Sequence, residues 1–401
     1  MATSTFLPIN VDVTFRITDA HEMHTKCSLK QKNKANVRTS CLVGSSHLYT
    51  ASSYRGEKAH AKDCRRRIRH FVAKRGLMQK NRASLLKVVA STVLKGFQES
   101  IFPSFLPSDV QNFEEQTARE LASRIQQLPV QTSLAKVPIM TSCVVPIIKE
   151  THMLPVLLLH GFDSSCLEWR NTYPLLEQSG SECWAMDILG WGFSTSAEPI
   201  SSYNVKSKRE HLYKFWKTYI RKPVALVGAS LGGATAIDFC LHYPKAVRKL
   251  VLIDAQGYSE GLGHMANLPR ILAYAGVAVL KNVLLRTYAN RLIYSNISWR
   301  NLIDAMRIGR LHCLMPSWED ATVDFMLSGG YNVASSICQV QQEVLVVWGE
   351  QDKIFPKHFA KKFERDLPNA RLELISDCGH FPHVEKPNVV APLITTFVKE
   401  K

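Results

Sequence analysis

The sequence predicts an α/β fold with a mostly parallel central sheet, helices on both faces of that sheet, and a helical lid. From about residue 137 onward, short β-branched or apolar runs alternate with helix-like stretches, and between 257 and 337 this alternation stops. Strand, helix and strand in succession are typical of a parallel sheet covered on both faces. A composition of 46% hydrophobic and 21% charged residues is that of a globular protein, which excludes a chain that is disordered throughout.

Taken in order along the chain, the elements follow from these patterns. The expected strands are 142–147, 155–159, 182–187, 223–227, 249–253, 344–348 and 372–375. The expected helices are 167–176, 208–220, 231–242, 358–367 and 389–399. The segment 257–337 has a helical pattern and is rich in aliphatic side chains, among them Ile271, Leu272, Val277, Val279, Leu280, Val283, Leu284, Leu285, Leu292 and Ile293. We expect a lid there that lines a water-poor pocket at the carboxyl ends of the strands.

The formal net charge of +16 is concentrated at the N-terminus. Residues 1–90 hold 18 Lys and Arg against five acids, which leaves 32 basic and 29 acidic residues in 91–401. A basic segment rich in Ser and Thr is typical of an organelle-targeting peptide. We therefore predict a plastid transit peptide over 1–70, with mitochondrial targeting or an uncleaved arm as alternatives, and no nucleic-acid binding by the nearly neutral remainder.

An extension over 71–136 is expected between the transit peptide and a domain over 137–401. The basic run 65–75 could bind nucleic acid or anionic lipid, but we favour the interpretation that it is the tail of the targeting peptide. The amphipathic stretch 90–127, broken by Pro103 and Pro107, fits a helix packed on the domain or a peripheral membrane contact. The longest apolar runs are about ten residues long, whereas a membrane-spanning helix needs about 20.

A candidate nucleophile lies between an expected strand and an expected helix. The strand 223–227 runs into Gly228, Ser230 and Gly232 in the pattern Gly-x-Ser-x-Gly. A sharp turn of this kind holds a serine hydroxyl out of the sheet, at the positive end of the following helix. Serine needs an adjacent base, itself oriented by a carboxylate, to react at neutral pH.

Both partners follow downstream in the order that this architecture uses. Asp352 comes just after the strand 344–348, and His380 comes after the strand 372–375. Asp352 could instead only cap the next helix, in which case Asp254 or Glu350 would supply the carboxylate. His383 competes for the role of the base, but the placement of His380 directly after Gly379 favours His380.

The oxyanion of an acyl-transfer intermediate needs two backbone N–H donors. We expect these donors to be the amide of Leu231, next to the serine, and the amide of Phe162 in the loop after the strand 155–159. Gly161 lets that loop approach the substrate, and His160 is expected to be part of its scaffold.

These motifs together make residues 140–401 resemble the α/β-hydrolase family, and with the N-terminal segment they resemble plant plastid-targeted serine hydrolases. The matching positions are His160-Gly161-Phe162, Asp187-x-x-Gly190-x-Gly192-x-Ser194, Gly228-x-Ser230-x-Gly232-Gly233, Asp352 and Gly379-His380. The resemblance implies an α/β-hydrolase fold. No cofactor is expected, and ten cysteines with no Cys-x-x-Cys pair and no close Cys/His grouping argue against a zinc site, so no metal is expected either. Serine at 230 disfavours the branches of the family with an aspartate nucleophile, and no His-x4-Asp motif of the proposed acyltransferases is present.

The expected activity is hydrolysis of a hydrophobic carboxylic ester, such as an acyl lipid or a prenyl or phytyl ester, in the plastid. The fold alone fixes neither the substrate nor the reaction class. A ligand receptor or scaffold on the same fold, and a carbon–carbon bond hydrolase or acyltransferase using the same three residues, stay open. The sequence does not predict the oligomeric state.

Overall fold

The chain forms two compact units, residues 1–99 and 100–401, each described by itself. The computed structural model describes the strand backbones within 11–52 and residues 101–148, 153–258, 261 and 263–400. The first unit contains an antiparallel sheet of order β1-β2-β3-β4 that the sequence did not predict. Its strands are β1 Val11–Val13, β2 Thr25–Asn33, β3 Asn36–Val43 and β4 Leu48–Ser52. The basic run 65–75 and the start of the amphipathic stretch, 90–100, lie outside the described residues.

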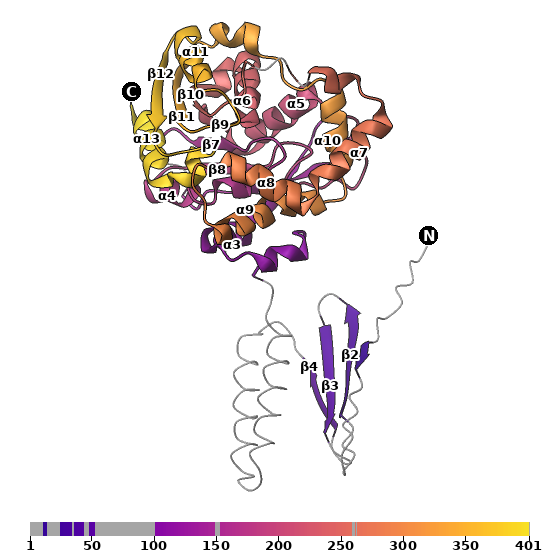
Figure 1. Cartoon of the computed structure of the whole chain (residues 1–401). Helices are drawn as coiled ribbons and strands as arrows, with labels where there is room; N and C mark the ends of the chain where they lie inside the picture. Colours follow the sequence, from indigo (N-terminus) through magenta and orange to yellow (C-terminus); the bar gives the residue numbers. More distant parts are fainter. Residues whose placement is uncertain are drawn as a thin grey trace. The chain divides into compact units, whose positions relative to one another are not determined.

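The second unit is built on an eight-stranded sheet of order β12-β11-β10-β9-β7-β8-β6-β5 (Figure 1). The strands are β5 Ile125–Val130, β6 Ile139–Val144, β7 Val156–Leu159, β8 Cys183–Met186, β9 Val224–Ala229, β10 Val247–Ile253, β11 Glu343–Gly349 and β12 Ala370–Ile375. The strands from β12 to β8 run parallel, whereas β6 and β5 are antiparallel to their neighbours. This sheet confirms the predicted fold class.

Helices cover both faces of the sheet, so its central strands are buried. The helices outside the lid are η1 Ser108–Asn112, α3 Gln116–Ser123, η2 Cys166–Trp169, α4 Tyr173–Gln178, α5 Val205–Phe215, the π-helical turn η3 Trp216–Ile220, α6 Leu231–His242, η4 Pro244–Ala246, α11 His358–Asp366, α12 Pro382–Glu385 and α13 Pro387–Lys399. Helix α4 packs against α13, and α5 packs against α6. Every residue of β7, β8 and β9 is buried, as expected for parallel strands covered on both faces.

The domain begins earlier than the sequence predicted. Strand β5 pairs along the whole of β6, from Ile125 opposite Val144 to Val130 opposite Ile139. Before β5, Phe102 and Leu106 are buried in the main core, as the alternative of packing on the domain requires. The boundary at 137 was therefore wrong. Strand β5 gives little strand signal because Gln126, Gln127 and Pro129 interrupt its aliphatic residues, and an edge strand tolerates a proline.

The lid is helical as predicted, and no strand occurs among its described residues. It consists of η5 Gly263–Asn267, α7 Arg270–Leu280, α8 Val283–Ile293, α9 Trp299–Leu311, η6 His312–Leu314, α10 Trp318–Leu327 and η7 Ala334–Gln339. The expectation that its aliphatic residues line a water-poor pocket at the carboxyl ends of the strands was wrong for six of the ten, because these six are exposed: Ile271, Leu272, Val279, Val283, Leu284 and Leu285. Of the others, Val277 is buried.

No single helix in the described part of the chain is long and apolar enough to cross a membrane. Helices α7 and α8 reach the required length and composition only together, and they bend by 72° at the break between them.

Candidate active site

Ser230 occupies a strained turn between β9 and α6. Its backbone φ is +50°, a conformation that residues other than glycine rarely adopt. The turn is possible because its glycines allow close backbone approach. A Cβ atom on Gly228 would lie 2.2 Å from the carbonyl oxygen of Gly232, and one on Gly232 would lie 2.4 Å from that of Leu159. The turn therefore places Ser230 at the carboxyl end of β9 and at the N-terminus of α6.

Ser230, His380 and Asp352 form a continuous hydrogen-bonded chain. The Oγ atom of Ser230 lies 3.0 Å from Nε2 of His380, and Nδ1 of His380 lies 2.8 Å from Oδ2 of Asp352. A proton on Nδ1 that is donated to Asp352 leaves Nε2 as the acceptor for the serine hydroxyl. The three side chains come from positions 122 and 28 residues apart in the chain and follow β9, β11 and β12, with β10 lying between β9 and β11 in the sheet.

Asp352 faces His380 and does not cap the next helix, α11, which begins at His358 without a side-chain cap. Its Oδ1 accepts hydrogen bonds from the amides of Ile354 and Phe355, at 2.7 and 3.1 Å, and so stabilises the loop after β11. Its Oδ2 faces His380. Burial alone would raise the pKa of Asp352, but the hydrogen bond with His380 and the charge of its ring outweigh burial and lower that pKa. Asp352 is therefore ionised when the imidazole becomes charged.

Asp254 lies next to this chain rather than in it. It follows β10 and is fully buried, and its carboxylate accepts a hydrogen bond of 3.0 Å from the amide of Gly349. One oxygen each of Asp254 and Asp352 and a ring nitrogen of His380 all lie within 4.8 Å of one another. Burial and, after it, the neighbouring carboxylate of Asp352 raise the pKa of Asp254 well above its usual value. A protonated Asp254 can donate a hydrogen bond to Asp352.

The two remaining alternatives are occupied elsewhere. The carboxylate of Glu350 lies 2.6 Å from Nζ of Lys357 and 2.7 Å from Oγ of Ser376. His383 is fully buried, and its Nε2 lies 3.1 Å from Oε1 of Glu168. Burial lowers the pKa of His383, although Glu168 opposes this shift. Neither Glu350 nor His383 hydrogen-bonds to Ser230 or His380.

The loop after β7 lies against the serine. A Cβ atom on Gly161 would be 3.3 Å from Cβ of Ser230, so a side chain there would crowd the nucleophile. The amide of Gly161 donates to the carboxylate of Glu168, at 3.1 and 3.2 Å from its two oxygens. This leaves the next amide, that of Phe162, and the first amide of α6, that of Leu231, as the donors nearest in sequence to the site. No motif in the sequence indicated this role of Glu168.

His160 is part of the scaffold, as expected. Its Nε2 accepts a hydrogen bond of 3.0 Å from the amide of Ile188, so the proton resides on Nδ1, which donates to the carbonyl of Gly161 at 2.8 Å. The neighbouring carboxylate of Asp187 accepts from the amides of Cys166 and Phe193, at 2.6 and 2.9 Å. These contacts fix the loops around the serine and leave neither side chain free for proton transfer.

The lid is attached directly to both loops of the site. Asp163, next to Phe162, forms a buried ion pair with Arg286 of α8 and accepts a hydrogen bond of 2.7 Å from the indole of Trp318 in α10. At the other end of α8, the carbonyl of Ile293 accepts a hydrogen bond of 2.7 Å from the amide of His380. The sequence could not reveal these contacts because their partners lie 87 to 155 residues apart.

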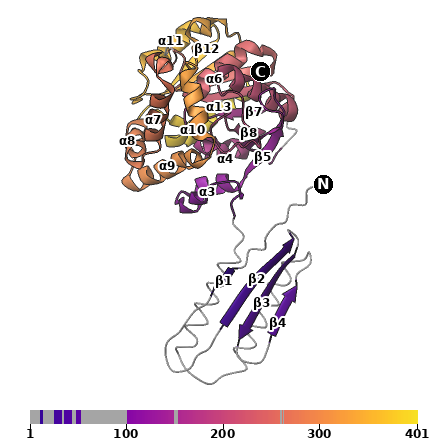
Figure 2. The ribbon, with the colours of Figure 1, turned by 90° about the vertical axis from the view of Figure 1, so that its right-hand side faces the viewer.

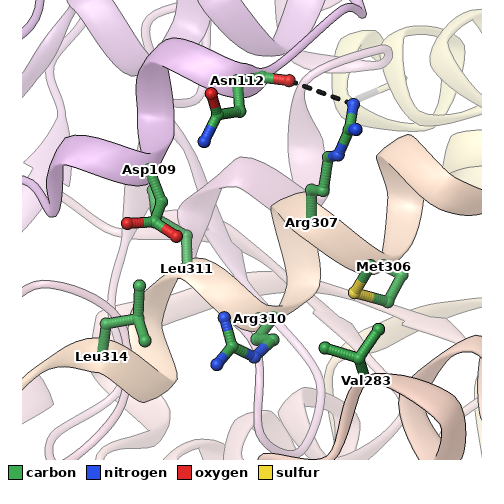
Figure 3. Close-up of a pocket in the computed structure, with 8 residues that line it drawn as sticks. All are labelled: Asp109, Asn112, Val283, Met306, Arg307, Arg310, Leu311 and Leu314. Atoms are coloured by element: carbon green, nitrogen blue, oxygen red, sulfur yellow. Dashed lines mark hydrogen bonds between the residues drawn. The ribbon is translucent and has the colours of Figure 1, made fainter.

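A pocket of about 180 Å³ lies elsewhere, between η1, α9 and the start of α8 (Figure 3). Its lining residues are Asp109, Asn112, Val283, Met306, Arg307, Arg310, Leu311 and Leu314. None of the three hydrogen-bonded residues of the candidate active site belongs to this lining.

A parallel sheet with a strained serine turn after one central strand defines the α/β-hydrolase class of folds. Residues 156–393, more than half of the chain, match the family model described as the alpha/beta hydrolase family. The chain therefore belongs to the alpha/beta hydrolase family, as the motifs predicted, and it is a hydrolase of that family.

Relatives and solved structures extend this assignment. The alpha/beta hydrolase domain-containing protein VTE7 of Arabidopsis thaliana is 50% identical over 302 residues, which cover 75% of this chain and 91% of the relative. The 2-hydroxy-6-oxo-2,4-heptadienoate hydrolase of Pseudomonas putida is 24% identical over 255 residues, which cover 61% and 88% of the two chains. A thermophilic esterase from Thermogutta terrifontis superposes with a TM-score of 0.58 at 19% identity, covering 68% of this chain and 98% of the esterase.

Proposed function

We propose that this chain is a serine hydrolase that cleaves a hydrophobic carboxylic ester, such as an acyl lipid or a prenyl or phytyl ester, in the plastid. The observation that carries the proposal is the hydrogen-bonded chain from Ser230 through His380 to Asp352. The basic, hydroxylated N-terminal segment and the plant relative support the plastid location.

The proposed reaction has two halves. The Oγ atom of Ser230 attacks the ester carbonyl while Nε2 of His380 takes its proton, and the amides of Phe162 and Leu231 donate to the oxyanion. Collapse of the tetrahedral intermediate breaks the ester bond, and His380 returns the proton to the departing alcohol. Water, deprotonated by His380, then attacks the acyl-enzyme and releases the acid and free Ser230. Asp352 orients His380 and stabilises its positive charge.

Labelling and turnover test this proposal on the full chain. We expect a fluorophosphonate to modify Ser230 and long-chain p-nitrophenyl esters to be hydrolysed. Ser230→Ala should abolish labelling and lower kcat by at least about 10³-fold. Ser376→Ala, which removes another serine hydroxyl in a loop near the site, is the matched control and should leave both readouts unchanged. Labelling that persists in Ser230→Ala, or ligand binding with no turnover in the wild type, would contradict the proposal and favour a receptor.

A second candidate is hydrolysis of a carbon–carbon bond by the same three residues. It is favoured by one comparison, the 24% identity to a 2-hydroxy-6-oxo-2,4-heptadienoate hydrolase. Mass spectrometry of the products distinguishes the two reactions, because an ester yields an alcohol and an acid, whereas cleavage of a carbon–carbon bond next to a carbonyl yields an acid and no alcohol.

A further inference from the structure

Helices α7 and α8 present an exposed apolar surface, which we call the α7–α8 face. It is formed by Ile271, Leu272, Val279, Leu284, Leu285 and Tyr288. Ile271 is 83% exposed and Leu284 is 79% exposed, and α8 contains no buried residue at all. Large contiguous apolar patches are rare on monomeric soluble proteins and mark surfaces that contact a partner or a membrane.

The orientation of α7 explains this exposure. Its buried residues, Ala273 and Val277, lie one helical turn apart and face α10, against which α7 packs. The larger aliphatic residues of α7 lie on the opposite side. Helix α8 lies in front of the sheet in Figure 1, and α7 and α8 form the left edge of this domain in Figure 2. The α7–α8 face is therefore on the outside of the lid.

Helices α7 and α8 themselves contain only basic charged residues, although Glu319 and Asp320 of α10 bind Lys281 and Tyr274 beside them. Residues 261–303 contain five Lys and Arg and no acidic residue. Three of the five are paired with acids from elsewhere: Lys281 with Glu319, Arg286 with Asp163 and Arg300 with Glu114. Within the described part of the chain, the other two, Arg270 before the first exposed aliphatic residue and Arg291 near the end of α8, form no ion pair. Both are exposed.

The pocket of Figure 3 adjoins this face, because Val283, the first residue of α8, lines it. Arg307 and Arg310 line the same pocket against one acid, Asp109, and Arg307 is also paired with Glu114 at 3.1 Å. Arg310 is held by a hydrogen bond of 3.1 Å from its Nε to the carbonyl of Lys281, in the turn between α7 and α8. A basic pocket beside an exposed aliphatic surface fits a phosphate-bearing headgroup beside acyl chains.

We propose that the α7–α8 face docks on an anionic lipid bilayer, with its aliphatic side chains at the boundary between headgroups and acyl chains and with Arg270 and Arg291 on the lipid phosphates. Surface helices with an apolar face and basic flanks bind membranes in this way. Because α8 also holds the Asp163 and His380 loops, the docked surface is directly connected to the candidate active site. A lipid ester could then enter from the bilayer rather than through water.

Vesicle flotation of the full chain tests the proposal, with Ser230→Ala as the background so that docking is measured without any reaction. We expect binding to vesicles of phosphatidylcholine with one third phosphatidylglycerol, and weaker binding to phosphatidylcholine alone. Ile271→Ser with Leu284→Ser should weaken binding by about tenfold. Arg270→Gln with Arg291→Gln should weaken it by about fivefold for each arginine, the equivalent of about 1 kcal/mol per basic residue near an anionic surface.

The matched control is Ile147→Ser with Val389→Ser, which removes two exposed aliphatic residues outside the lid. Because the basic N-terminal segment is present in every variant, hydrogen exchange must localise the contact. We expect vesicles to protect the amides of 270–293. Equal binding of the α7–α8 variant and the control, or protection confined to other segments, would overturn the proposal. So would a self-associated chain that becomes monomeric on the α7–α8 substitutions while vesicle binding stays unchanged.

Discussion

The central strands and the helices α7 and α8 are both rich in aliphatic residues, yet they differ in where those residues lie. In β9 every residue is buried between two helical layers, whereas in α8 none is buried. Strand β9 has neighbours on both edges and both faces. Helix α8 packs against α9 and is also attached through polar groups, such as the Arg286 guanidinium and the Ile293 carbonyl. A hydrophobic segment is therefore expected to have apolar surroundings, but its sequence does not show whether the rest of the protein provides them.

A second contrast lies within the candidate site, between two buried aspartates. Asp352 accepts from His380 and has a lowered pKa, whereas Asp254 has a raised one and faces Asp352. Ionising two carboxylates this close together costs free energy. The hydrogen bond with His380 favours the charge on Asp352 rather than on Asp254.

The largest expected effect is the difference in kcat between the variants of these two aspartates. We expect Asp352→Asn to lower kcat by about 10⁴-fold, because the amide favours the wrong tautomer of His380. Asp254→Asn should keep activity within about tenfold, because an amide can still donate to Asp352 as a protonated carboxyl does. Steady-state kinetics on the same ester measures both. Equal losses would show that Asp254 acts as a charged group.

The ion pair between the lid and the loop of Phe162 should contribute more to stability and activity than an exposed ion pair on the same lid. Arg286→Met leaves Asp163 buried without its partner and should lower the free energy of unfolding by about 3 kcal/mol. We also expect kcat to fall, because the neighbouring Phe162 amide loses its support. Arg300→Met is the control, since its pair with Glu114 is largely exposed and should contribute at most about 1 kcal/mol. Urea unfolding measures the stability and steady-state kinetics measures kcat. Equal losses in the two variants would contradict this role for Arg286.

The same substitution in the sheet and in the lid tests the first comparison. Leu226→Ala in β9 removes a fully buried side chain and should cost at least about 2 kcal/mol of unfolding free energy. Leu284→Ala in α8 should change it by no more than about 0.5 kcal/mol, because that side chain is exposed. Urea unfolding without lipid measures both changes. A large cost for Leu284→Ala would mean that protein, not lipid, covers the α7–α8 face.

Per pH unit, the smallest effect on stability is the pH dependence that Asp254 adds. Because burial raises its pKa above the unfolded value of about 3.9, its contribution is complete below that pH and is lost as pH rises. Wild-type stability should therefore fall relative to Asp254→Asn from about pH 4 upward, by at most about 1.4 kcal/mol per pH unit. Urea unfolding across pH 4–8 measures the difference. Parallel profiles would mean that Asp254 is already ionised in the fold.

The sequence by itself determined the fold and the candidate residues, because both follow from patterns within short segments of the chain. Alternating apolar strands and amphipathic helices predicted the sheet, and the turns around Ser230, Asp352 and His380 each follow a strand within a few residues. Strand β5 was missed because two glutamines and a proline interrupt its aliphatic residues, as an edge strand tolerates.

Only the tertiary structure decided how distant residues combine. It placed His380 rather than His383 beside Ser230, put Asp254 next to Asp352, and joined Asp163 to Arg286 across 123 residues. It also turned the aliphatic side of α7 away from the sheet, because the small residues Ala273 and Val277 pack on α10 instead. Such outcomes depend on which surfaces meet in space, and hydrophobic periodicity within one segment does not contain that information.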